Sequence, residues 1–164
     1  MSAHANASRI DIRPASGVDR SIIEALVAQS LATTRFAEVP SYAVRAAFER
    51  PTRESRAIVA DRASVVAGFA LFGEVAGAIG TGRLHFIGVP AEERRHGVGA
   101  ALCEAAVSQL SAEGARSVVA EMPDDPLLTG GRALLARCGF VETSRVPDYY
   151  SDGVDLVLLQ RTVA

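Results

Sequence analysis

Two adjacent arginines and two closely spaced glycines lie directly before a predicted helix. Arg94, Arg95, Gly97 and Gly99 fall within residues 84–104, LHFIGVPAEERRHGVGAALCE, which read as an apolar strand, a charged turn and a helix. The first N–H groups of a helix have no intrahelical acceptor, and the helix dipole adds partial positive charge there. This pattern predicts a binding site for a phosphate-like anion, to which the arginines add two permanent charges.

The glycine pair alone does not identify the ligand, because glycines also occupy turns that bind nothing and only need a positive φ. A dinucleotide-binding turn needs a third glycine three residues further on, where this sequence has Leu102. All 17 basic residues are arginine, so a phosphate loop, a kinase-type phosphate site or a Schiff base that depends on lysine is excluded.

Length and composition indicate one globular domain. With 164 residues and 49% apolar residues, the chain can bury a single core, which must be mainly aliphatic because aromatic residues make up only 5%. The formal charge of −2, without a run of like charges, argues against non-specific binding of nucleic acid. The two cysteines and three scattered histidines show no metal-ligand spacing, so we expect no metal site.

The sequence also predicts where the protein resides. No apolar segment approaches the roughly 20 residues that cross a bilayer, so no membrane association is expected. The N-terminus lacks the basic region and apolar core of a secretory signal, which favours a cytoplasmic location. Residues 1–7 are small and polar and are expected to be disordered, which leaves residues 8–164 as the domain.

The spacing of apolar residues predicts alternating strands and helices. The expected strands are residues 8–13, 56–61, 65–74, 84–89, 117–122, 140–146 and 154–160. The expected helices run from an Asp19 cap to about Thr33, from Ser41 to about Arg50, from Gly99 to about Glu113, and from Leu128 to Cys138. Residues 147–153 are expected to join the last two strands. The order β-α-α-β-β-β-α-β-α-β-β predicts an α/β (α+β) fold with one mixed sheet of about seven strands flanked by helices.

Three segments resemble motifs of the GCN5-related N-acetyltransferase (GNAT) superfamily. Residues 94–99, Arg-x-x-Gly-x-Gly, are similar to its Q/R-x-x-G-x-G/A signature. Residues 133–140, ALLARCGF, resemble its A-L-Y-x-x-x-G-F segment, and residues 149–155, YYSDGVD, resemble the Y-Y-x-D-G-x-D hairpin of N-terminal and related acetyltransferases. With the element order, the resemblance covers about residues 8–160 and implies a GNAT-like fold.

The resemblance implies acetyl-CoA as the donor and a primary amine as the acceptor. The pyrophosphate is expected on the backbone N–H groups of residues 95–100, and the pantetheine arm beside the backbone of residues 87–89. The implied cofactor-binding residues are Ile87, Gly88, Val89, Arg94, Arg95, His96, Gly97, Val98, Gly99 and Ala100. The two arginines either contact the phosphates or are solvated turn residues.

Amine attack on a thioester needs a neutral amine, and therefore benefits from a general base. The glutamate that some family members carry early in strand four corresponds to Arg83 here. Glu121 matches a strand-five glutamate that some peptide N-terminal acetyltransferases use as a base; alternatively, it is a strand-end residue that faces solvent. His85, expected to share a strand face with Ile87 and Val89, is either a second candidate base or a packed, neutral core histidine.

The leaving thiolate also benefits from an acid. The family tyrosine of A-L-Y-x-x-x-G-F is Leu135 here, and the family's helix asparagine corresponds to Leu128, which puts part of the CoA contact in question. Tyr149 and Tyr150 are expected to line the acceptor site, where either one can double as the acid. The alternative is an aromatic pair that packs on the last strands.

The sequence therefore predicts an N-acetyltransferase that moves an acetyl group from acetyl-CoA to a primary amine of a small molecule, or to a peptide or protein N-terminus, by direct attack. The alternative is a catalytically weak CoA-binding or acyl-CoA-binding sensor or regulatory module of the same fold, because Leu135 and Arg83 replace two family residues. A longer acyl group and a homodimer are left open.

Overall fold

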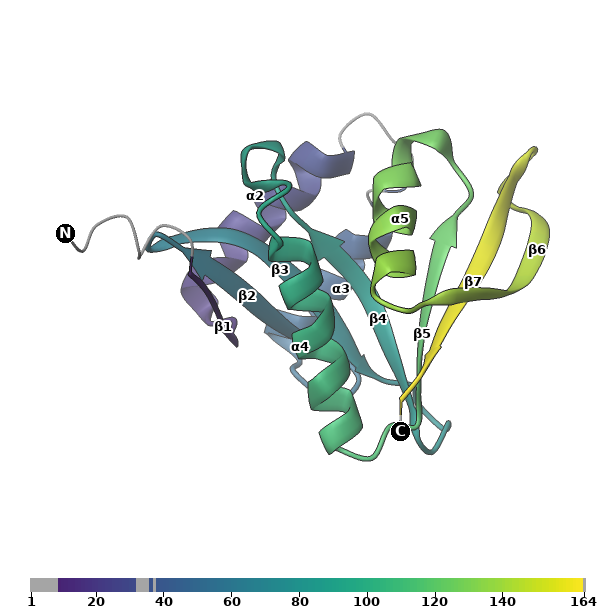
Figure 1. Cartoon of the computed structure of the whole chain (residues 1–164), viewed down its shortest axis with the longest axis horizontal. Helices are drawn as coiled ribbons and strands as arrows, with labels where there is room; N and C mark the ends of the chain where they lie inside the picture. The colour runs from purple at the N-terminus through teal and green to yellow at the C-terminus, as the bar shows by residue number, and fades with distance from the viewer. Residues whose placement is uncertain (1–8, 32–35, 37, 164) are drawn as a thin grey trace.

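The computed structural model describes residues 9–31, 36 and 38–163. Within that part of the chain, seven strands form one sheet with helices on both faces (Figure 1). The strands are β1 (Ile10–Pro14), β2 (Arg56–Arg62), β3 (Val65–Glu74), β4 (Thr81–Gly88), β5 (Ser117–Pro123), β6 (Val141–Ser151) and β7 (Val154–Thr162). The helices are α2 (Arg20–Leu31), α3 (Glu38–Glu49), α4 (Val98–Ala112) and α5 (Thr129–Arg137), with 3-10 turns η1 (Gly17–Asp19), η2 (Ala91–Glu93) and η3 (Pro126–Leu128). The predicted mixed sheet and element order are confirmed.

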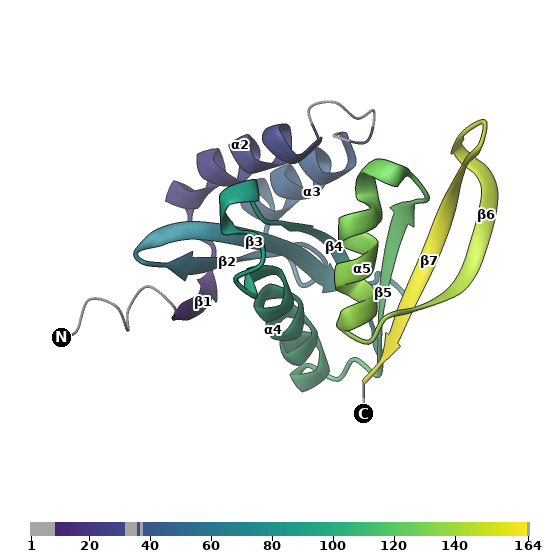
Figure 2. The same ribbon diagram turned by 45° about the horizontal axis from the view of Figure 1, so that its top comes forward.

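The sheet opens between its two central strands. The strand order is β1-β2-β3-β4-β5-β7-β6, and only β4 and β5 run parallel. Their pairing joins residues 81–83 to residues 117–119, after which the two strands diverge towards their C-terminal ends (Figures 1 and 2). The other neighbouring strands pair antiparallel over longer stretches, so the short β4–β5 pairing is the place where two halves of one sheet separate.

Two hydrophobic clusters cover the two faces of the sheet. On one face α4 packs over the strands, with Leu102 and Leu110 buried against Phe72 and Val118. On the other face α2 and α3 pack through residues such as Ile23 against β2 and β3. Figure 2 shows α2 and α3 on one side of the sheet and α4 and α5 on the other. The clusters are mainly aliphatic, as the composition predicts.

Several predicted element boundaries are wrong. Strand β4 begins at Thr81 instead of Leu84. Helix α3 begins at Glu38 instead of Ser41, so Pro40 lies in its first turn. Proline is tolerated there because the first helical N–H groups have no acceptor in the helix. Strand β6 extends to Ser151, so Tyr149 and Tyr150 belong to a strand and not to the predicted connection.

Asp19 precedes α2, but its carboxylate does not act as the simple cap that the sequence predicts. It lies in η1, is buried, and accepts hydrogen bonds from the backbone N–H of Ser16 at 2.7 Å and from Arg13 at 2.8 Å. Its partners therefore come from the chain before the helix, which fixes the path from β1 into α2.

Some expectations fall outside the described residues. These are the disorder of residues 1–7, the first residue of the predicted strand 8–13, and the end of the first helix at Thr33. Within the described residues, no helix combines the length and the apolar character needed to cross a membrane.

Candidate active site

The turn before α4 exposes the predicted anion-binding groups. Gly97 is the N-cap of α4 and has a φ of 82°, while Arg95 has a φ of 64°. Positive φ is unfavourable for a non-glycine residue and is found preferentially where function requires a particular backbone path. Residues 94–97 are exposed, whereas Val98 is buried and anchors the helix. The first-turn N–H groups of α4 therefore begin at a solvent-exposed, arginine-bearing turn.

Close packing fixes this turn against the ends of β4 and α5. A Cβ added to Gly99 would lie 2.9 Å from Leu134 Cδ2 and 3.6 Å from Val89 Cγ2, so a glycine permits this approach. The Nε of Arg94 donates a hydrogen bond to the carbonyl of Val89 at 3.3 Å. The structure thus brings together the turn and the end of the strand, as the sequence predicts.

The strand edge beside the turn is free to pair. Beyond Arg83, β4 has no pairing with β5 among the described residues, so the backbone groups of residues 85–88 on that side lack a strand partner. Ile87 and Val89 are half-buried and pack on the α4 side. An open strand edge of this kind can accept an extended chain through backbone hydrogen bonds.

His85 does not share a face with Ile87 and Val89, so that expectation is wrong. Leu71 pairs with Phe86 and Phe72 with Leu84, so His85 forms a bulge in β4 that interrupts the alternation of side chains. Its Nε2 lies 3.2 Å from the carbonyl oxygen of Glu54.

Burial lowers the pKa of His85, and the nearby charge of Arg83 acts in the same direction. The imidazole is therefore neutral at pH 7. This state fits a packed histidine, and it also leaves the ring able to accept a proton.

Glu121 lies on β5 opposite Leu158 of β7, with 38% of its side chain exposed. Its carboxylate contacts Nη2 of Arg83 on β4 at 3.2 Å, across the point where the two strands separate. The neighbouring residues Val118 and Ala120 are buried on the α4 side, so Glu121 points to the opposite face. A carboxylate in this position is solvent-accessible and paired, which removes the cost of burying a bare charge in an apolar strand.

Tyr150 lies close to this carboxylate. Its ring makes edge-on contacts with Phe36, at 5.6 Å between ring centroids, and with Tyr149, at 5.0 Å. Burial raises the pKa of Tyr150, and the negative charge of Glu121 raises it further. Tyr149 is 60% exposed. The structure therefore gathers the predicted Tyr150, Tyr149 and Glu121 at the sheet opening, with Phe36 as an apolar neighbour.

Comparison with known proteins agrees with this geometry. The model of the Acetyltransferase (GNAT) family matches residues 24–140, which is more than half of the chain. The chain belongs to the GNAT family. The resemblance inferred from three short motifs is thereby confirmed, while no curated protein sequence matches the chain.

Solved GNAT-fold structures cover nearly the whole chain. A protein classed as a GNAT-family acetyltransferase from Desulfovibrio desulfuricans is 22% identical, with a TM-score of 0.83 over 95% of this chain and 100% of that one. The yncA protein of Salmonella typhimurium, solved with its cofactor acetyl-CoA, is 18% identical, with a TM-score of 0.74 over 95% of each chain. The ribosomal-protein-S18-alanine N-acetyltransferase of Escherichia coli is 19% identical, with a TM-score of 0.72 over 95% of each chain.

A cavity lies beside the opening of this GNAT sheet. It has a volume of about 430 Å³ and is lined by residues of the segment 122–132, at the end of β5, in η3 and at the start of α5. Leu128, which stands where the family asparagine is expected, lines this cavity, whereas Leu135 is half-buried against the α4-side core. Leu135 therefore serves packing and cannot donate a proton.

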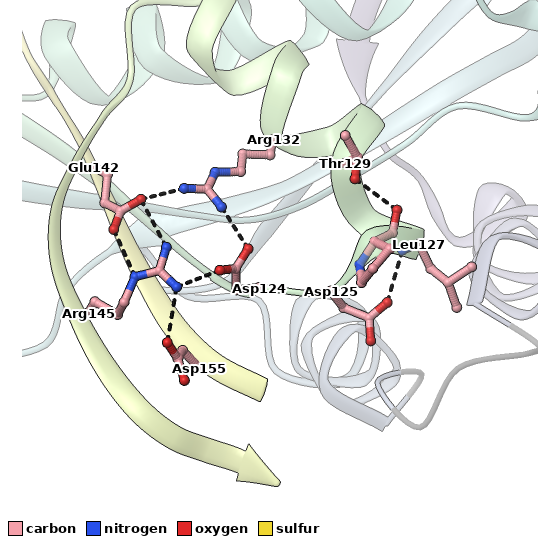
Figure 3. A network of polar contacts seen from close by, with 9 residues as sticks. Asp124, Asp125, Leu127, Thr129, Arg132, Glu142, Arg145 and Asp155 are labelled. Atoms are coloured by element: carbon pink, nitrogen blue, oxygen red, sulfur yellow. Dashed lines mark hydrogen bonds and ion pairs between the residues drawn. The ribbon is translucent and has the colours of Figure 1, made fainter. Parts of the chain in front are cut away.

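Sequence reasoning missed an ion-pair network, two of whose members, Asp124 and Arg132, line this cavity. Asp124, Arg132, Glu142, Arg145 and Asp155 form one network of ion pairs that joins β5, α5, β6 and β7 (Figure 3). It also missed the pairing of Arg83 with Glu121. The residues of these groups are distant in sequence, so spacing gives no signal; only the strand order reveals them. Among the described residues, no group of three or more potential metal ligands is present.

Proposed function

We propose that this GNAT protein transfers an acetyl group from acetyl-CoA to a primary amine by direct attack. The observation that carries the proposal is the opening between β4 and β5. The exposed turn at the start of α4 lies on one face of the sheet there, and Glu121 faces the other. A donor held on the α4 side can present its thioester to an acceptor through this opening.

The residues at the donor side fit acetyl-CoA. The N–H groups from Arg95 to Ala100 suit a pyrophosphate, and the exposed guanidinium of Arg95 suits a phosphate. His96 and Val98 contribute backbone groups to the same turn. The free edge of β4 at residues 87–89 suits the amide groups of a pantetheine arm. When bound, acetyl-CoA supplies the thioester carbonyl that the amine attacks.

The residues at the acceptor side supply proton transfer. The Glu121 carboxylate accepts a proton from the acceptor ammonium, directly or through water, and Arg83 holds that carboxylate at the opening. The Tyr150 hydroxyl binds the acceptor and donates a proton to the leaving sulfur; because its pKa lies above the ordinary value, the hydroxyl carries that proton at neutral pH. Tyr149 lines the same site. The neutral His85 is the second candidate base.

A second candidate function follows from Leu135. The proton donor of the family's helix motif is replaced by a packed leucine, which favours a CoA-binding sensor or regulatory module with weak catalysis. We still favour the acetyltransferase, because Tyr149 and Tyr150 remain as candidate proton donors. The YYxDGxD motif that contains them favours a peptide or protein N-terminus over a small amine as the acceptor.

Thiol release from acetyl-CoA, measured with a panel of small amines and peptides with free N-termini, separates the two functions. We expect turnover with at least one peptide and tight binding of CoA in calorimetry. Tight CoA binding without thiol release for any acceptor would contradict the acetyltransferase and support the sensor. Absence of CoA binding would contradict both.

A further inference from the structure

Asp155 stands opposite an unusual interruption of the last hairpin. Val146 of β6 pairs with Leu156 of β7, and the next recorded pair joins Ser151 to Val154. Residues 147–150 therefore oppose Asp155 alone. Such a wide bulge leaves the backbone groups of several residues without ladder partners, so other groups must satisfy and shape it.

The Asp155 carboxylate supplies those contacts. One oxygen accepts a hydrogen bond from the backbone N–H of Asp148 at 3.0 Å, and the other accepts one from Nη1 of Arg145, also at 3.0 Å. Asp148 has a φ of 52°, and its own carboxylate accepts from the N–H of Gly153 at 2.7 Å. The two aspartates thus fix both ends of the bulge and its left-handed residue.

The bulge carries the tyrosine pair of the acceptor side. Tyr149 and Tyr150 follow Asp148 directly, and the ring of Tyr150 packs edge-on against Phe36. The orientation of both rings therefore depends on the backbone path that Asp148 adopts.

The Asp155 carboxylate also belongs to the ion-pair network at the end of β5, the strand that carries Glu121. Arg145 bridges Asp155 to Asp124, which comes three residues after Glu121 in sequence, and Arg132 of α5 binds Asp124 at 2.7 Å (Figure 3). The backbone N–H of Asp124 also donates to the carbonyl of Asp155 at 2.9 Å. The bulge and the end of β5 are consequently joined at Asp155.

We propose that Asp155 is a positioning residue of the acceptor site, which sets the β6 bulge so that Tyr150 faces the acceptor near Glu121. The proposal rests on the proposed function for its kinetic consequence, but not for its structural one. It gives Asp155, the last residue of the YYSDGVD motif, a positioning role that is distinct from acetyl-CoA binding and from proton transfer.

Asp155→Ala and Asp155→Asn test it. The alanine removes both contacts, whereas the asparagine keeps an oxygen for the Asp148 N–H and loses the charge that pairs with Arg145. We expect Asp155→Ala to raise the acceptor KM about ten-fold or more, with the acetyl-CoA KM within about two-fold, and Asp155→Asn to give a smaller rise. Glu104→Gln, which breaks the Glu104–Arg161 pair on the α4 side, is the matched control and should leave both KM values unchanged.

A double-mutant cycle separates positioning from general loss of structure. In a Tyr150→Phe background, Asp155→Ala should raise the acceptor KM by a smaller factor, since both changes act through one ring. Fully additive effects, or equal rises in the KM values of acceptor and acetyl-CoA, would overturn the proposal.

A readout without turnover distinguishes failure of this proposal from failure of the proposed function. The chain has three tyrosines, and Tyr42 on α3 is an internal reference. In NMR spectra with labelled tyrosine, Asp155→Ala should shift or broaden the signals of Tyr149 and Tyr150 and leave that of Tyr42 in place. Asp155→Asn, which retains a folded bulge, should shift them less. Unchanged signals of Tyr149 and Tyr150 in Asp155→Ala would overturn the proposal even if the protein acetylates no amine.

Discussion

Glu121 and Arg83 occupy adjacent strands where the sheet opens, with 38% and 36% of their side chains exposed. Pairs of this exposure contribute little to stability, roughly 0–1 kcal/mol, so their contact is not needed to hold β4 against β5. It keeps the carboxylate near the opening, where an acceptor ammonium can replace or join the guanidinium. In the proposed mechanism, Arg83, which stands where some family members carry a strand-four glutamate, therefore acts together with the proposed base.

Glu121→Gln tests the base at constant size. We expect kcat/KM for the acceptor to fall by about 10²–10⁴-fold, the usual contribution of a general base. Arg83→Gln is the matched control because it also breaks the ion pair but keeps the carboxylate, and it should lower kcat/KM by no more than about ten-fold. Steady-state kinetics of both variants suffices. An equal loss of kcat/KM in the two variants would mean that the Arg83–Glu121 ion pair is needed for activity and that Glu121 does not act as a general base.

Tyr150 allows a prediction about pH dependence. Its pKa lies above the ordinary value, because of burial first and then of the negative charge on Glu121, so the hydroxyl stays protonated from pH 6 to pH 9. Tyr150→Phe should therefore lower kcat/KM by a constant factor, about 10- to 100-fold, without changing the shape of its pH profile in that range. Tyr149→Phe should have a smaller effect. Unchanged rates in both variants would remove the tyrosines from the mechanism.

At the scale of elements, the sequence predicted most helices and strands because their apolar spacing is local information. The prediction failed where a residue distant in the sequence determines the local backbone structure. Residues 147–150 contain the Pro-Asp pair of a turn, yet they belong to β6 because Asp155 holds their bulge. Likewise, the bulge at His85 depends on the register with β3, so alternation along β4 alone placed this side chain on the wrong face.

The turn that we propose holds the donor was more predictable for the same reason. The turn and the start of α4 are contiguous, so residues 94–100 are brought together by one local geometry. The proposed acceptor part assembles residues from β4, β5 and β6, which only the strand order brings together.

The α4 turn carries its own prediction. The double substitution of Arg94 and Arg95 by glutamine should raise the acetyl-CoA KM by about 5- to 50-fold, since each charged contact to a phosphate contributes on the order of 1 kcal/mol or more. The acceptor KM should stay the same, because these residues lie on the other face of the opening. Arg137→Gln, which removes an exposed cation near the end of α5, is the control. An acetyl-CoA KM within two-fold of the parent protein would show that both arginines are solvated turn residues.

At the scale of the whole molecule, the buried carboxylate of Asp19 and its partner Arg13 join the elements at the β1 edge of the sheet. Arg13 of β1 binds Asp19 at 2.8 Å and Asp61 of β2 at 2.7 Å, so one guanidinium connects two strands to the start of α2. Asp19 is 2% exposed and also accepts hydrogen bonds from Ser16. Removing the charge of a buried, fully bonded carboxylate is expected to destabilise the fold, because Arg13 then loses its main partner.

The hydrogen bonds from Arg13, opposed by burial and assisted by those from Ser16, hold the pKa of Asp19 well below its usual range. A lowered pKa in the folded state means that the stabilisation is complete above the unfolded pKa of about 3.9 and is lost as the pH falls below it. Asp19→Asn should therefore reduce the free energy of unfolding by about 2–3 kcal/mol at pH 7 and by less at pH 3. Urea unfolding at the two pH values measures the difference. As a control, Asp11→Asn, in the exposed Arg9–Asp11 pair, should change the free energy of unfolding by less than about 0.5 kcal/mol. A destabilisation by Asp19→Asn that is the same at pH 3 and pH 7 would show that shape and not charge makes Asp19 important.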